Sequence, residues 1–244
     1  MIIVLIIAFT LGLSIGSFIN VVIYRLPLSI TTDSAINLNN PKRSFCPVCK
    51  QKLNALELIP VFSFLWQKGK CRHCSATISW QYPTIEIVTA LITVLIVFIF
   101  GATVETGFYL LLSWFLIPLL IIDIKEQLLP DVLTLPLMWI GFIYQMLHGN
   151  LQDSVIGAMV GYLSLWGIYW LFKLVRNKEG MGYGDFKLLA ALGAWVGWMA
   201  LPKLLLIASV LSLLFFAIGK INKDQAFAFG PFLIVGFLLV SVLR

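Results

Sequence analysis

The sequence predicts an all-α polytopic membrane protein with about eight transmembrane helices and one small polar loop. Of its 244 residues, 60% are hydrophobic and 11% are charged. A water-soluble domain of this size needs more polar surface than that. Apolar runs recur along the chain, many of them close to the roughly 20 residues that cross a bilayer as a helix. All four cysteines lie in a single polar segment.

Eight apolar runs supply the candidate helices. They cover residues 2–23, 85–101, 107–123, 132–147, 154–172, 186–200, 202–218 and 226–243. The first run has no basic start and no small-residue cleavage site, so we expect a retained helix. The sixth and seventh runs almost touch, and they form either two spans, a re-entrant hairpin or one broken element. The predicted divisions are a first helix at 1–23, a four-cysteine loop at 24–84 and a membrane core at 85–244.

The basic residues predict the orientation of the chain. Fifteen of the 17 Lys and Arg residues fall in loops on one side of the predicted spans, and loops rich in these residues stay in the cytoplasm. We therefore expect the cysteine loop inside and both termini outside. Because the basic residues occupy short loops rather than one continuous face, the net charge of +6 reflects topology. No nucleic-acid partner is expected.

Two CxxC knuckles form the cysteine loop, Cys46-Pro-Val-Cys49 and Cys71-Arg-His-Cys74. Their spacing is typical of a zinc ribbon. Four thiolates match the tetrahedral preference of zinc and leave no open position for a substrate, so the prediction is a structural zinc. Two disulfides are the alternative, which a reducing cytoplasm disfavours.

Four acidic residues lie where hydrocarbon makes charge expensive. Asp123 ends the third run, Asp131 and Asp185 come just before the fourth and sixth runs, and Glu86 lies inside the second. Helix N-capping is an alternative explanation for Asp131 and Asp185. Asp123 stands at a helix C-terminal end, where negative charge is disfavoured, and this position indicates a functional role.

Gly182 and Gly184 flank Asp185 and leave room for an extended peptide. No phosphate-loop, GxSxG or HExxH pattern occurs, so other common hydrolase sites are not indicated. Two carboxylates on one membrane face can share a proton and act as general base and general acid on a peptide bond. The residues therefore predict an aspartic peptidase that works through Asp123 and Asp185.

Several segments together resemble the bacterial prepilin peptidases, which cleave and N-methylate type IV prepilins and the pseudopilins of type II secretion. The matching pieces are GSFINVVIYRLP at 16–27, both knuckles, YPTIE at 82–86, Asp123 with LPD at 129–131, and GYGDFK at 182–187. The resemblance implies cleavage after a glycine at the cytoplasmic face of the bacterial inner membrane, followed by methylation with S-adenosylmethionine. It makes 85–244 the peptidase core.

By this resemblance Asp123 and Asp185 take the catalytic positions, and Asp131 competes for the first. The remaining residues that it implicates are Gly182, Gly184, Lys187 and Glu86 around the aspartates, and Gly69 and Lys70 for methyl transfer. A plain loop turn is an equal explanation for Gly69 and Lys70.

Three alternative functions stay open from the residues. The first is a peptidase without methyl transfer. The second is a small proton-coupled transporter with a zinc-bound regulatory loop, which predicts acidic residues near the middle of the bilayer. The third is a nonenzymatic assembly factor that docks secretion proteins through its zinc loop.

Overall fold

The computed structural model describes residues 1–32, 37–38, 40–41, 43–176, 182–218 and 228–242. These residues form helices, and their only β pairing is two isolated bridges, so the all-α prediction is confirmed. Five of the basic residues used to predict orientation lie outside the described residues: Lys42, Lys178, Lys220, Lys223 and Arg244.

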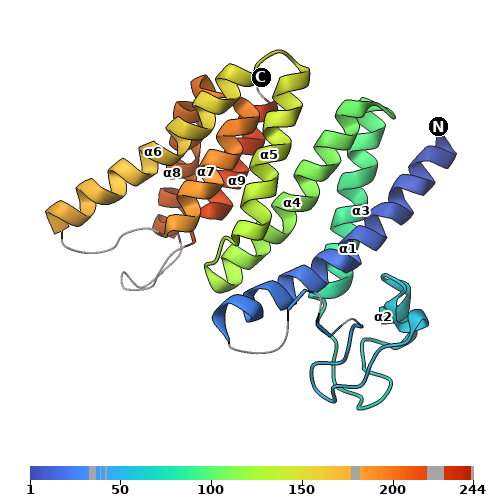
Figure 1. The fold of residues 1–244 in the computed structure, drawn as a ribbon. Helices are drawn as coiled ribbons and strands as arrows, with labels where there is room; N and C mark the ends of the chain where they lie inside the picture. The colour runs from blue at the N-terminus through green and yellow to red at the C-terminus, as the bar shows by residue number, and fades with distance from the viewer. Residues whose placement is uncertain (33–36, 39, 42, 177–181, 219–227, 243–244) are drawn as a thin grey trace. The chain divides into compact units, whose positions relative to one another are not determined.

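Each of the eight apolar runs forms a helix (Figure 1). These helices are α1 (Ile2–Thr31), α3 (Gln81–Phe100), α4 (Val104–Glu126), α5 (Asp131–Leu147), α6 (Leu151–Arg176), α7 (Tyr183–Val196), α8 (Leu201–Ile218) and α9 (Gly230–Val242). Short elements add α2 (Phe62–Trp66) and the 3₁₀ turns η1 (Ala55–Leu58) and η2 (Trp198–Ala200).

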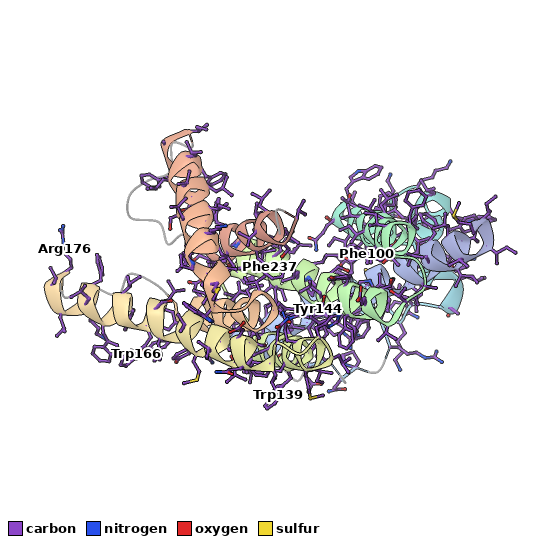
Figure 2. The ribbon with its side chains drawn as sticks, turned by 90° about the horizontal axis from the view of Figure 1, so that it is seen from above. Phe100, Trp139, Tyr144, Trp166, Arg176 and Phe237 are labelled. Carbon is purple, nitrogen blue, oxygen red and sulfur yellow. The ribbon has the colours of Figure 1, made fainter. Side chains whose placement is uncertain are left out.

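The prediction of eight spans is not confirmed, although the chain has the helices of a multi-pass membrane protein. Among the described residues, α1, α3, α4, α6 and the segment Trp198–Ile218 are long and apolar enough to cross a membrane. Helices α5 and α9 are apolar but shorter. Exposed aromatic side chains such as Trp139 and Trp166 project outward from the helices (Figure 2), as expected for contact with lipid and its interface.

The chain divides into two compact units, Met1–Pro118 and Leu119–Arg244. In the first, α1 packs closely on α3 because glycines remove side chains from the contact. A Cβ added at Gly12 would lie 2.6 Å from the Cα of Ala90, and one at Gly16 would lie 2.7 Å from the Cα of Glu86. Small residues of this kind allow close approach of membrane helices.

Helix α1 continues to Thr31, past the apolar run that ends at residue 23. Its extra turns are held by Arg25, whose buried guanidinium donates hydrogen bonds to the carbonyl oxygens of Pro41 at 2.6 Å and Arg43 at 3.0 Å. Arg25 thus follows the apolar part of the helix, and its hydrogen bonds attach the start of the cysteine loop to the helix.

Helix α7 forms the core of the second unit. Apart from Lys187, every residue from Asp185 to Val196 is buried, and α5, α6 and α9 pack around the helix. The backbones of α6 and α7 meet at Gly157 and Gly193, where a Cβ on either residue would collide with the carbonyl oxygen of the other. This close packing holds α7, whose N-terminal turn carries Asp185.

The sixth and seventh runs form two separate helices rather than one. Helix α7 ends at Val196, and Gly197 follows with a φ of +74°, a conformation that favours glycine. The chain then passes through η2 into α8. Both helices therefore exist, joined at a sharp glycine corner.

Candidate active site and metal centre

The four cysteines of the first unit lie together as the sequence predicts. Their Sγ atoms are all within 4.8 Å of one another, and none of them forms a disulfide. The Sγ atoms of Cys46 and Cys74 are 3.9 Å apart. Sulfur atoms bound to tetrahedral zinc at about 2.3 Å stand roughly 3.8 Å from one another. The cluster therefore fits a tetrahedral metal ion with small adjustments.

Both knuckles are built by the same backbone pattern. In each, the N–H of the first cysteine, Cys46 or Cys71, donates to the carbonyl five residues later, and its carbonyl accepts from the N–H four residues later. That later residue has a positive φ in both cases, +60° at Lys50 and +58° at Ser75. The repeated turn aims two thiols from each knuckle at one point.

Hydrogen bonds from the backbone of Cys74, and then of His73, lower the pKa of the Cys71 thiol. For Cys74 a backbone hydrogen bond at Ala76 acts in the same direction, but burial and the neighbouring thiols outweigh it and raise the pKa to about 11. Thiolates crowded this closely repel one another, so all four would ionise together only with a cation among them.

Asp123 lies in the last turns of α4 and is only 4% exposed. Among the described residues its Oδ2 atom has no hydrogen-bond partner. The backbone N–H of Gly230, the first residue of α9, interacts favourably with the carboxylate. A Cβ at Gly230 would collide with Oδ2. The carboxylate thus faces the N-terminus of another helix, whose dipole favours negative charge.

Asp185 is the third residue of α7 and is 8% exposed. The N-cap is Gly182, so the N-cap interpretation of Asp185 is wrong. From the third position its carboxylate reaches back to the backbone N–H of Gly182, as acidic residues at this position do in a capping box. The charge of Asp123 acts on the Asp185 carboxyl group. The fold therefore brings the two buried carboxylates close enough to interact electrostatically within the second unit.

Asp131 lies in a different environment. It is the exposed first residue of α5, with Pro130 at the N-cap, so the N-cap interpretation fails here too. Both of its carboxylate oxygens accept hydrogen bonds from Lys187 Nζ at 2.7 Å. A half-exposed ion pair accounts for Asp131 and for Lys187.

The glycines beside Asp185 are needed for the room that they leave to neighbouring atoms, not for an unusual backbone conformation. Gly182 has an ordinary extended conformation, with φ −79° and ψ 146°. Gly184 is constrained, because a Cβ there would lie 2.8 Å from the Cβ of Leu129. The Leu129–Asp131 segment consequently lies directly against the turn that carries Asp185.

The other predicted site residues belong to the first unit. Glu86 is buried, and its Oε2 accepts a hydrogen bond from the N–H of Val61 at 2.7 Å. Gly69 has a φ of +69° and packs on the ring of Phe64, whereas Lys70 is exposed. The turn explanation for Gly69 is therefore sufficient by itself.

Sequence reasoning missed Gly230 as a neighbour of Asp123. The available signal was the Gly230-Pro231 pair inside the last apolar run, because proline is favoured in the first turn of a helix. That pair marks a helix start, and a helix start is a natural position for a carboxylate to approach.

Comparisons with known proteins match nearly the whole chain. A model of the bacterial peptidase A24 N-terminal domain matches residues 10–100, and a model of the type IV leader peptidase family matches residues 110–217. No solved structure matches the chain.

Curated relatives carry one shared name, prepilin leader peptidase/N-methyltransferase. The protein from Aeromonas salmonicida (strain A449) is 47% identical over 93% of this chain and 86% of its own length. Those from Stutzerimonas stutzeri and Pseudomonas aeruginosa are 44% and 43% identical, over 93% and 92% of this chain and 86% and 85% of their own lengths. With this similarity over nearly all of both sequences, the chain belongs to the type IV leader peptidase family of prepilin leader peptidase/N-methyltransferases.

Proposed function

We propose that this protein removes the leader peptide from type IV prepilins or type II secretion pseudopilins and then methylates the new N-terminal amine. Asp123 and Asp185 are the catalytic residues of the cleavage. The observation that carries this assignment is that two carboxylates from different helices are both buried and interact electrostatically. Membership of a family whose relatives are named for both activities supports the two-step function.

The cleavage uses the pair as one base and one acid. The ionised carboxylate takes a proton from water, and the oxygen of that water bonds to the scissile carbonyl carbon. The protonated carboxyl group supplies a proton to the departing nitrogen as the carbon–nitrogen bond breaks. Each half of the reaction restores the other protonation state, which is how a coupled carboxylate pair serves both roles.

Asp131 acts outside this chemistry. Lys187 already neutralises it, and its exposure to solvent removes the proton sharing that burial promotes. The Asp131–Lys187 ion pair instead joins the start of α5 to the N-terminal part of α7. Together with the contact of Leu129 on Gly184, this ion pair holds the Leu129–Asp131 segment next to the turn that carries Asp185.

The four-cysteine segment within residues 24–84 binds a structural zinc and serves methyl transfer with S-adenosylmethionine. Cys46, Cys49, Cys71 and Cys74 are the ligands, and zinc bound to them supplies folding energy rather than an open coordination site. The excess of basic residues in the loops on one side of the predicted spans supports a cytoplasmic position for this loop and for the aspartates. The transporter alternative lacks support, because the two buried aspartates lie at helix ends.

The test of the catalytic pair uses the purified full chain and a prepilin substrate. Asp123→Asn and Asp185→Asn each lower the cleavage rate by about 10³-fold or more, as expected for removal of a catalytic acid or base. Asp131→Asn is the matched control and retains cleavage within about tenfold. The assignment fails if either buried variant cleaves like the wild type, or if Asp131→Asn is the inactive one.

A further inference from the structure

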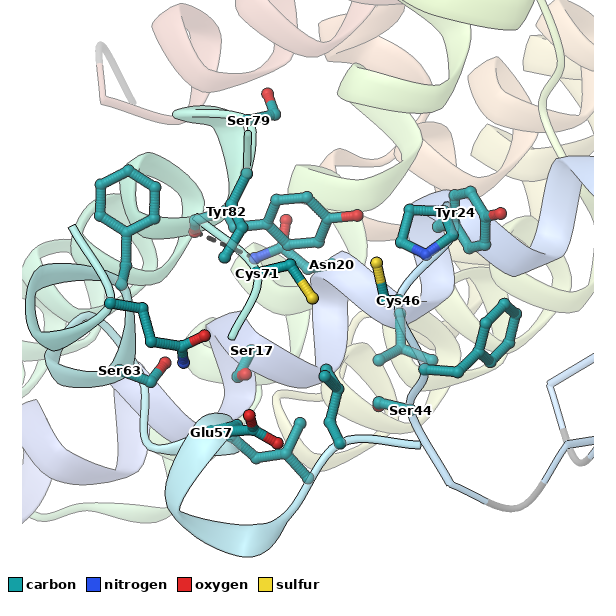
Figure 3. A pocket seen from close by; sticks show the side chains of 18 of the residues that line it. Ser17, Asn20, Tyr24, Ser44, Cys46, Glu57, Ser63, Cys71, Ser79 and Tyr82 are labelled. Carbon is teal, nitrogen blue, oxygen red and sulfur yellow. Dashed lines mark hydrogen bonds between the residues drawn. The ribbon is translucent and has the colours of Figure 1, made fainter. Parts of the chain in front are cut away.

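A cavity of about 330 Å³ lies in the first unit, bounded by α1, the cysteine loop and the first two turns of α3 (Figure 3). Its volume falls within the range of small-molecule sites. Aromatic side chains form much of its wall, namely those of Tyr24, Phe45, Phe64 and Tyr82. Neither the aspartate pair nor the metal cluster explains why such a cavity is present.

Two buried oxygen atoms on its lining residues have no hydrogen-bond donor among the described residues. One is Asn20 Oδ1 and the other is Glu57 Oε1. Asn20 is 3% exposed, and its Nδ2 donates to the carbonyl oxygens of Gly16 and Tyr82 at 3.2 and 3.1 Å. This orientation is fixed, because a flipped amide would place its oxygen against two carbonyls. Buried acceptors of this kind normally have partners.

Glu57 is held in place by its other oxygen, Oε2, which accepts the backbone N–H of Asn54 at 2.7 Å. The free Oε1 stands 3.8 Å from His73 Nε2, too far for a hydrogen bond. The Glu57 side chain is only 5% exposed, so water does not compensate it freely.

The charge of the lining is negative. It contains the carboxylates of Glu57 and Glu86, and Arg25 is the single cation among the lining residues that the structure describes. The guanidinium of Arg25 is already occupied by the carbonyl oxygens of the loop. Two carboxylates therefore share a cavity in which no free cation is supplied by the lining.

The missing partner is a small organic cation that also carries hydrogen-bond donors. Carboxylates and an amide oxygen attract positive charge, while aromatic walls favour both cations and flat rings. A simple metal ion does not use the aromatic walls, and an anion is repelled. S-adenosylmethionine combines a sulfonium, an ammonium and an adenine ring in one molecule.

We propose that this cavity binds S-adenosylmethionine, with Asn20, Glu57 and Glu86 recognising its cationic end. The proposal rests on the methyl-transfer part of the proposed function and assigns that part to specific residues. Cys46 and Cys71 also line the cavity. The metal-bound knuckles thus form one of its walls, which gives the structural metal a direct connection to methyl transfer.

The chemistry balances without a further reactant. The lone pair of the neutral N-terminal amine forms the new nitrogen–carbon bond with the methyl group. The sulfur–carbon bond breaks and leaves its electron pair on sulfur, so the donor becomes the neutral thioether S-adenosylhomocysteine. The methylated ammonium then releases a proton to water.

The test measures binding of S-adenosylmethionine and S-adenosylhomocysteine to the full chain by calorimetry. These two ligands differ by the sulfonium methyl and its charge, so their affinity ratio reports recognition of that charge. Glu57→Gln and Glu86→Gln each lower the affinity for S-adenosylmethionine relative to S-adenosylhomocysteine about tenfold, while S-adenosylhomocysteine still binds. Glu105→Gln, an exposed glutamate at the start of α4 outside the cavity lining, leaves the ratio unchanged.

The outcomes distinguish a failure of the cavity assignment from a failure of the methyltransferase function. If the wild type binds and uses S-adenosylmethionine but both variants keep the ratio, the cavity assignment is overturned and the methyltransferase function stands. If the wild type leaves cleaved prepilin unmethylated, the methyl-transfer function itself fails. If Glu57→Gln or Glu86→Gln loses bound metal, that variant has misfolded. The other variant, whose residue lies on a different element, then tests the cavity assignment.

The N-terminal amine of the cleaved product is the other cation in this reaction. A peptide with the sequence of the mature N-terminus therefore serves as a competing probe. If its binding falls in Glu57→Gln while the ratio of the two adenosyl ligands is unchanged, the cavity belongs to the amine. That result overturns the assignment to the methyl donor.

Discussion

Asp123 has a position that its own helix makes unfavourable. The C-terminal end of α4 repels a carboxylate, yet the side chain is buried and one oxygen lacks a hydrogen-bond partner among the described residues. The N-terminus of α9 offsets this through the backbone N–H of Gly230. The N–H of Gly230 thus stabilises the carboxylate, while the Oδ2 atom without a hydrogen-bond partner can still accept a proton or a hydrogen bond from a ligand.

Gly230→Ala tests this arrangement. The new methyl group collides with Asp123 Oδ2, so we expect the rate of prepilin cleavage to fall at least tenfold, which corresponds to about 1.4 kcal/mol in the barrier. Gly167→Ala is the control, because a Cβ at Gly167 meets nothing within 4 Å. Equal cleavage rates in the two variants would show that Gly230 does not shape the site.

The Asp131–Lys187 pair allows a second test at the scale of single residues. Its side chains are 52% and 35% exposed, and exposed ion pairs of this kind contribute about 0.2–1 kcal/mol. A double-mutant cycle of Asp131→Ala and Lys187→Ala, followed by unfolding in detergent, should give a coupling energy in that range. A coupling of roughly 3 kcal/mol would instead indicate a buried pair with a role closer to catalysis.

At the scale of elements, the site depends on how tightly α7 is held. Its contact with α6 is a backbone-to-backbone approach at Gly157 and Gly193. Ser154 Oγ adds a hydrogen bond to the carbonyl of Ala194 at 2.5 Å, and Trp195 Nε1 donates to Leu137 at 3.0 Å. Buried hydrogen bonds between helices fix α7 in rotation as well as in distance. The direction in which Asp185 points follows from that rotation.

Gly193→Ala should therefore weaken the fold and the activity together. Overpacking of a buried contact costs about 1–3 kcal/mol, so the melting temperature in detergent falls, and the cleavage rate falls as Asp185 shifts. Gly167→Ala on α6 again provides the control, since alanine in an open helix position is slightly stabilising. If Gly193→Ala melts like the wild type, the backbones of α6 and α7 can separate without loss.

At the scale of the whole molecule, two compact units divide the chemistry. The cysteine cluster and the cavity lie within Met1–Pro118, and the aspartate pair lies within Leu119–Arg244. The family matches follow a similar division, at residues 10–100 and 110–217. Under the proposed function, peptide cleavage and methyl transfer therefore have separate structural bases in one chain.

Removal of the metal should separate the two activities. In the double variant Cys46→Ser with Cys71→Ser, or after chelation, the loop loses the ion that organises it. Bound metal and N-methylation of the product fall by at least tenfold, whereas leader cleavage stays within about threefold. Elemental analysis and mass spectrometry of the product measure these changes, and restoration of methylation by added zinc after chelation is the control. An equal loss of cleavage would contradict the division.

The sequence by itself determined the helical membrane architecture and the two cysteine knuckles that come together, and it singled out Asp123 and Asp185 as candidate catalytic residues. Hydrophobic run length, cysteine spacing and the cost of charge near lipid are local properties that a chain displays in order. The eight predicted spans are not confirmed, since five of the described helices are long and apolar enough to cross a membrane, and an apolar run alone does not distinguish a span from a helix buried in protein.

Only the tertiary structure decided which groups meet. The approach of Gly230 to Asp123, the pairing of Asp131 with Lys187 and the unpaired acceptors around Asn20 all join residues from separate segments. Such contacts depend on helix rotation and close backbone approach, which are set by side-chain packing across the whole unit. A linear pattern contains no direct record of them, and the roles of these residues follow from the folded chain.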